Sequence, residues 1–146
     1  MSHEKLYTEV NQLLSDLHIY YQNTRGFHWN IKGKRFFELH VKFEELYTEA
    51  LTNIDDIAER LLAIGGQPLH TFQDYLNTSN IEAVKGVSKD EEAVTSIVDQ
   101  LAKLVKQEEV VKAAAIEAED SETEDMMIAL INAQQKHAWM FKSWLD

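Results

Sequence analysis

The chain has 146 residues, of which 45% are hydrophobic and 27% charged, enough apolar sequence for one globular domain with a hydrophobic core. It contains no cysteine, which excludes disulfides, thiolate nucleophiles and zinc-finger clusters, so any metal must be held by histidine and carboxylate. The net charge of −11 disfavours contact with nucleic acid or anionic lipid and favours attraction of cations.

The N-terminal half predicts two long helices. Apolar residues recur at spacings of three and four from about residue 4 to residue 30, and Gly33 then marks a short turn. A second periodic stretch predicts a helix over about 36–64, which Gly65, Gly66 and Pro68 close. The length of this second helix makes it the expected spine of the fold.

The C-terminal half predicts two more long helices after a long connection, in which a short helix is expected over about 71–76. The segments 88–91 and 121–124 each fit a capping box, in which a serine and a glutamate side chain satisfy backbone N–H groups. They predict helices over about 89–118 and 122–144. Four long helices with a single long crossover predict an all-α, ferritin-like four-helix bundle, in one domain over residues 1–146.

No segment predicts export or membrane insertion. The N-terminus enters amphipathic sequence at once, without the basic, apolar and cleavage-site regions of a signal peptide. The longest strongly apolar run, residues 126–131, is too short to span a bilayer. We therefore expect a cytoplasmic protein without a membrane anchor.

Four polar residues lie on one stripe of the second predicted helix: His40, Glu44, Asp55 and Glu59. At about 100° per residue they share roughly a quarter of the helix circumference. Glu44 and Asp55 are nevertheless separated by roughly 16 Å along the axis, too far for one metal ion. A single chain therefore cannot bring the four residues to one site.

The spacing of these four residues is symmetric, because residues 40 and 59 have the same midpoint as residues 44 and 55. If a second copy of the helix ran antiparallel across a two-fold axis, His40 and Glu44 of one chain would face the partner's Asp55 and Glu59. Such a contact is isologous, so the dimer would carry two identical sites. A fifth candidate ligand, His28, ends the first helix, where an antiparallel neighbour would place it beside the start of the second.

Several local motifs resemble the Dps family of mini-ferritins. They are FHWNIKG at 27–33, FFELH at 36–40, IAER at 57–60, GGQP at 65–68 and KHAWMFK at 136–142. The resemblance covers nearly the whole chain. It implies a hollow dodecamer of four-helix subunits that oxidises Fe²⁺, preferentially with hydrogen peroxide, and stores the ferric mineral inside as protection against oxidative stress.

By matching position, the resemblance implies a metal site formed by His28, His40 and Glu44 of one subunit and the partner's Asp55 and Glu59. Glu44 departs from the family pattern, which often has aspartate there, so its direct or water-bridged contact with the metal stays open. No histidine in the chain has a glutamate three residues before it. This counts against a di-iron site inside one bundle, which needs that motif on two helices.

Two neighbours of the predicted ligands have two interpretations each. Trp29, beside His28, is a candidate electron donor during peroxide reduction, although an interface tryptophan more often only packs. Arg60, beside Glu59, either orients a carboxylate of the site or is an exposed helix cation.

Acidic residues gather at the start of the last predicted helix: Glu119, Asp120, Glu122, Glu124 and Asp125. Acids stabilise a helix N-terminus, but five exceed what a cap requires. In the Dps family, acidic residues near this helix line pores through which Fe²⁺ enters. We therefore expect a cation funnel here.

DNA binding is an alternative function that the family resemblance raises. Several members bind DNA through a mobile tail rich in lysine and arginine, which neutralises phosphates. This chain has no such basic tail and a strongly negative charge, so we expect negligible DNA affinity. A purely structural helical assembly, with the stripe as an interface network and no iron chemistry, is the third hypothesis.

Overall fold

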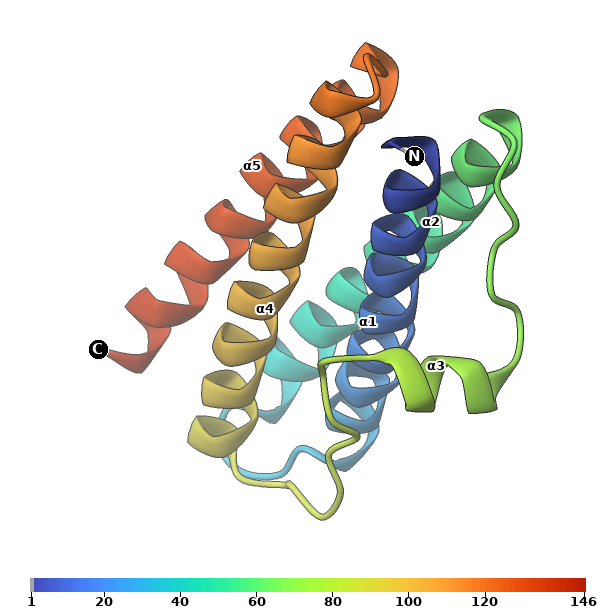
Figure 1. The fold of residues 1–146 in the computed structure, drawn as a ribbon. Helices are drawn as coiled ribbons and strands as arrows, with labels where there is room; N and C mark the ends of the chain where they lie inside the picture. The colour runs from blue at the N-terminus through green and yellow to red at the C-terminus, as the bar shows by residue number, and fades with distance from the viewer. Residues whose placement is uncertain (1) are drawn as a thin grey trace.

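The structure, a computed structural model, describes residues 2–146, and every regular element within them is an α-helix (Figure 1). The helices are α1 (Ser2–Asn30), α2 (Phe36–Ala63), α3 (Phe72–Thr78), α4 (Asp90–Glu117) and α5 (Ser121–Leu145). Each predicted helix begins and ends within two residues of its observed counterpart.

The four long helices form two antiparallel pairs, α1 with α2 and α4 with α5 (Figure 1). The connection after α2 returns along the bundle, carries α3 against α1, and so lets α4 run parallel to α2. α1 also packs on α4 and joins the two pairs. This arrangement confirms the predicted ferritin-like four-helix bundle with one crossover. No helix within residues 2–146 combines the length and apolarity needed to cross a bilayer.

The core follows the predicted apolar stripes. On α1, Leu6, Leu13 and Leu17 are completely buried, and on α4 Leu101 and Leu104 face them from the other pair. Each such side chain contributes about 1.5–3 kcal/mol through removal of its apolar surface from water. The apolar residues at the predicted three- and four-residue spacings on α1 and α2 are buried, except Tyr21 and Phe36, which are half-buried. The periodicity therefore identified the core-facing sides of α1 and α2.

The end of α2 depends on two glycines. Gly65 adopts φ of 99°, a left-handed conformation that disfavours other residues. The next residue, Gly66, donates its backbone N–H to the Leu61 carbonyl at 2.8 Å, and any Cβ there would collide with the Leu61 side chain. These contacts stop the helix where the sequence predicted and turn the chain into the crossover.

The two predicted capping boxes are wrong in detail. α4 begins at Asp90 after Lys89, without a side-chain cap, and the Ser88 carbonyl instead accepts a hydrogen bond from the Lys32 N–H at 3.0 Å. α5 is capped by Asp120, which accepts from the Thr123 N–H, so Ser121 lies inside the helix. Both serines match the cap pattern, but the chain enters each helix at a different residue.

Candidate metal centre

His28 and His40 form a stacked pair where α1 ends and α2 begins. Their ring centroids are 3.7 Å apart and the ring planes are inclined by 11°. His28 Nδ1 lies 2.6 Å from the His40 carbonyl oxygen, and His40 Nδ1 lies 2.7 Å from the His28 carbonyl oxygen. The antiparallel packing of α1 on α2 therefore brings His28 beside the start of the second helix, as predicted.

The two reciprocal hydrogen bonds fix the tautomer that each ring adopts when it is neutral. A carbonyl oxygen can only accept a hydrogen bond, so each Nδ1 must donate its proton. The Nε2 atom of each neutral ring then keeps a free lone pair, which is the form in which histidine binds a metal. His28 Nε2 also lies 3.8 Å from Oε1 of Glu44. The Glu44 carboxylate thus lies near the Nε2 atom of His28, at the end of α2 that carries the histidine pair.

Asp55 and Glu59 lie farther along α2, away from the histidine pair. Both side chains are exposed. No three histidine, aspartate or glutamate side chains within residues 2–146 come close enough together to hold a metal ion in one subunit. The single chain therefore presents two separate halves of the predicted ligand set, and their union across a two-fold axis stays a prediction.

The stripe that carries the candidate ligands is also apolar. Phe37, Val41, Leu51 and Leu62 on α2 are each more than half exposed, and Phe37 is 81% exposed. At the helical period all four fall within the same sector as Glu44 and Asp55. Exposed apolar groups that line up on one helix face are typical of a surface that another molecule covers.

The histidine pair has aromatic neighbours that the sequence analysis did not single out. The Tyr47 ring meets the His28 ring edge-on at a centroid distance of 5.3 Å, and Tyr21 meets Tyr47 edge-on at 5.8 Å. Burial and the nearby Glu44 carboxylate raise the pKa of the Tyr47 phenol. The spacing of His40, Glu44 and Tyr47 at i, i+4 and i+7 was the sequence feature that could have revealed Tyr47.

Arg25 lies against the rings of both Tyr21 and Trp29. Its guanidinium is 5.0 Å from the centroid of the Tyr21 ring and 5.0 Å from that of Trp29, and it donates a hydrogen bond to the Tyr21 oxygen at 3.1 Å. Trp29 itself is 58% exposed. The cation therefore faces Tyr21 and Trp29 rather than a carboxylate of the candidate site.

Arg60 does not orient a candidate ligand, and neither is it an isolated exposed cation. Its guanidinium pairs with Asp120 at 2.9 Å and donates to the Thr123 hydroxyl at 3.0 Å. Hydrogen bonds from Thr123 and Arg60 outweigh burial and lower the pKa of Asp120. Asp120 is thus committed to holding α5 against α2, while Glu119, Glu122 and Asp125 of the acidic group remain exposed.

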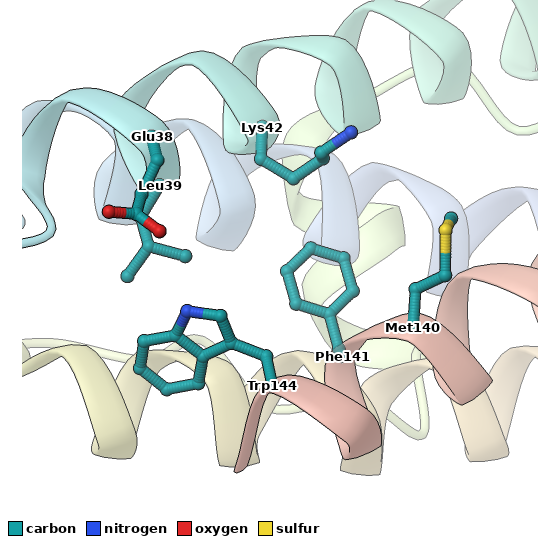
Figure 2. A pocket seen from close by; sticks show the side chains of 6 residues that line it. All are labelled: Glu38, Leu39, Lys42, Met140, Phe141 and Trp144. Atoms are coloured by element: carbon teal, nitrogen blue, oxygen red, sulfur yellow. The ribbon is translucent and has the colours of Figure 1, made fainter.

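A small apolar pocket lies between α2 and α5, and none of the candidate ligands lines it (Figure 2). Its volume is about 130 Å³. Leu39, Phe141 and Trp144 supply most of its wall, and Glu38 and Lys42 stand beside it on α2 (Figure 2). It lacks the convergent oxygen and nitrogen donors that a metal requires, so it is not the candidate centre.

Other polar groups lie inside the bundle. Glu108 of α4 is fully buried, and burial raises its pKa to about 8 although the side chain of Gln134 acts in the opposite direction. His137 Nε2 of α5 lies 3.1 Å from Glu49 of α2. Because its carboxylate partner is on another helix, no spacing within one helix predicts this pair.

Comparisons with known proteins agree with the fold. Residues 7–146 match the family model described as a ferritin-like domain. The DNA protection during starvation protein of Brevibacillus brevis is 39% identical over 137 residues, which are 94% of this chain and 92% of the relative.

Two solved structures have closely similar folds. The Dps protein of Vibrio cholerae O1, described as a member of a broad superfamily of ferritin-like diiron-carboxylate proteins, superimposes with a TM-score of 0.97 at 38% identity, covering 99% of this chain and 91% of that one. The Dps of Staphylococcus aureus superimposes with a TM-score of 0.93 at 40% identity, covering 98% and 96%.

Proposed function

Because the chain belongs to the Dps family of ferritin-like proteins, we propose that it is a ferroxidase and iron-storage mini-ferritin. Its substrates are Fe²⁺ and, preferentially, hydrogen peroxide. The ferric product is stored as mineral inside a dodecameric shell in the cytoplasm, which protects the cell against oxidative stress.

The observation that carries this proposal is the preset histidine pair. In their neutral form His28 and His40 offer Nε2 lone pairs, His28 Nε2 lies 3.8 Å from the Glu44 carboxylate, and backbone hydrogen bonds hold both rings. A mixed nitrogen and oxygen donor set suits Fe²⁺, although the same donors also accept Zn²⁺, Mn²⁺ or Co²⁺. The chemistry of the donors therefore fits iron as the substrate.

The missing donors come, in this proposal, from a second copy of the chain. Across a two-fold axis near Glu49 and Ala50, the partner's Asp55 and Glu59 meet the histidine pair. The exposed apolar residues on the same stripe of α2 support this contact, because burial in a dimer would remove them from water. Fe²⁺ held between the subunits keeps open positions where peroxide approaches and accepts electrons.

The alternatives have less support. The acidic charge of −11 opposes binding to phosphates, so DNA binding is not part of the proposal, despite the names of the relatives. A structural assembly without iron chemistry would not require two imidazoles with free Nε2 atoms beside a carboxylate.

Anaerobic titration with Fe²⁺, followed by hydrogen peroxide, tests the function. The wild-type protein is expected to bind Fe²⁺ at saturable sites and to oxidise it rapidly once peroxide is added. The double variant His40→Ala with Asp55→Ala removes one donor from each half of the site, so oxidation should slow by roughly 100-fold or more. Size-exclusion chromatography must show the same assembly as wild type. Equal rates in an intact assembly would refute the site.

Acidic residues at the start of α5 form the proposed cation funnel. Converting Glu122, Glu124 and Asp125 to their amides should slow iron uptake several-fold at low salt, because the local negative potential that attracts Fe²⁺ is reduced. The difference should shrink at high salt, where screening weakens steering. Asp120 stays unchanged because it holds Arg60.

A matched control for the funnel removes the same charge elsewhere. Glu91, Glu92 and Asp99 lie together along the start of α4. Their amide variants should take up iron at nearly the wild-type rate. If both triple variants slow uptake equally, net charge and not a funnel governs entry.

A further inference from the structure

We propose that Tyr47, in preference to Trp29, supplies an electron to hydrogen peroxide when a single Fe²⁺ occupies the site. This inference rests on the proposed iron oxidation and deepens it by assigning the source of a second electron. Reduction of hydrogen peroxide to two waters consumes two electrons, whereas one Fe²⁺ provides one. A site with one iron therefore needs a donor within the protein if no hydroxyl radical is to escape.

Tyr47 is the oxidisable ring in contact with the histidine pair. Within residues 2–146, the aromatic rings that touch the two imidazoles from outside the pair are Phe36, against His40, and Tyr47, against His28. Phenylalanine is far harder to oxidise than tyrosine. The 5.3 Å centroid distance from Tyr47 to His28 thus gives an electron a direct route through a ligand imidazole.

Trp29 has the less direct route despite adjoining His28 in sequence. Its side chain is 58% exposed, and its ring lies against the guanidinium of Arg25 at 5.0 Å. In the described chain it makes no ring contact with either imidazole. The side-chain contacts recorded for Trp29 lead through Arg25 and Tyr21 to Tyr47, whereas Tyr47 itself contacts His28.

The charges around the rings also favour Tyr47 over Tyr21 and Trp29 as the electron donor. Glu44 is three residues before Tyr47 on the same helix, so its carboxylate lies beside the phenol. Loss of an electron is favoured next to an anion and disfavoured next to a cation. Arg25 faces Tyr21 and Trp29 directly, and its hydrogen bond to the Tyr21 oxygen draws electron density from that ring. Arg25 also acts on the Tyr47 phenol, but more weakly than Glu44 does.

The redox step balances with these reactants. One Fe²⁺, one tyrosine, one hydrogen peroxide and one proton give one Fe³⁺, one neutral tyrosyl radical and two waters. Iron and tyrosine each lose one electron, the oxygen–oxygen bond of the peroxide breaks, and the phenolic proton ends in the water formed. Tyr21, in edge contact with Tyr47, is the next ring to which the radical can pass.

Freeze-quench electron paramagnetic resonance tests the assignment. The assembled protein is loaded anaerobically with one Fe²⁺ per site, mixed with one equivalent of hydrogen peroxide and frozen. We expect a tyrosyl signal that narrows when the protein carries ring-deuterated tyrosine and is unaffected by ring-deuterated tryptophan. Tyr47→Phe should lower the radical yield about fivefold or more, whereas Trp29→Phe and Tyr21→Phe keep most of it.

Binding of Zn²⁺, measured by calorimetry, separates electron donation from a structural role of Tyr47. The Tyr47→Phe variant should bind this redox-inactive ion as wild type does. A tryptophan radical that disappears in Trp29→Phe, or complete iron oxidation without any protein radical, would overturn the role of Tyr47 and leave iron oxidation standing. If wild type oxidised no iron, the proposed function itself would fail, and this inference with it.

Discussion

Shells assembled from equal amounts of His40→Ala and Asp55→Ala chains are expected to recover about a quarter of the wild-type iron-oxidising sites, although neither variant alone has a working site. Each proposed site takes its histidines from one subunit and its Asp55 from the partner. With random pairing, about half of the dimers contain one chain of each variant. In such a mixed dimer both substitutions fall in one of the two sites, and the second site keeps all its ligands. About a quarter of all sites are therefore intact. The recovery therefore reports directly whether a site is shared between subunits.

Co-refolding of the two variants, followed by a limiting dose of Fe²⁺ and peroxide, measures the recovered fraction. The matched control mixes His40→Ala with His28→Ala. Both lesions then lie in the same half of the site, so every dimer has two damaged sites and no recovery is expected. A site built within one chain would give no recovery in either mixture, which would refute the two-fold arrangement.

Replacing Glu108 with glutamine is expected to stabilise the bundle strongly at pH 9 and to change its stability little at pH 5. The ordinary pKa of glutamate is 4.5, and burial raises that of Glu108 to about 8. Between these values the unfolded chain has lost the proton and the folded chain keeps it. Wild-type stability therefore falls as pH rises from about 5 to about 8, by about 1.4 kcal/mol per pH unit at most.

At pH 9 the Glu108→Gln substitution should raise the free energy of unfolding by at most roughly 3–5 kcal/mol per subunit, since glutamine stays neutral at every pH. Urea unfolding at fixed subunit concentration, followed by circular dichroism at pH 5, 7 and 9, measures it. Glu117→Gln is the control, because its side chain on the same helix is exposed and pairs with Lys5. Parallel pH profiles for wild type and Glu108→Gln would show that the Glu108 carboxyl does not titrate as proposed.

The fold was predictable from the sequence because the residues that define each helix and each turn are close together in the chain. Spacings of three and four residues define one face of each helix, and the glycines at 33, 65 and 66 interrupt that pattern. The stripe from His40 to Glu59 was predictable for the same reason, because it lies on one helix. His28 required only the short turn between two antiparallel neighbours.

The polar partners could not be predicted because they join different helices. Arg60 meets Asp120 across 60 residues, and His137 meets Glu49 across 88. No periodicity within one helix specifies which neighbour a side chain will face. The predictions of the two helix caps were wrong for a related reason. The path of each connection into the bundle decides which residue begins the helix, and this path sets the positions of Ser88 and Asp120.

The hydrogen bonds made by the Nδ1 atoms of the histidine pair go to the main chain alone. The acceptors for both Nδ1 atoms are carbonyl oxygens, at His40 and His28 themselves, so no third side chain supports either ring through Nδ1. Substitutions elsewhere cannot delete these acceptors. The orientation of the two Nδ1 atoms consequently depends on the backbone where α1 ends and α2 begins. Substitutions around the site should preserve these hydrogen bonds as long as this part of the backbone keeps its fold.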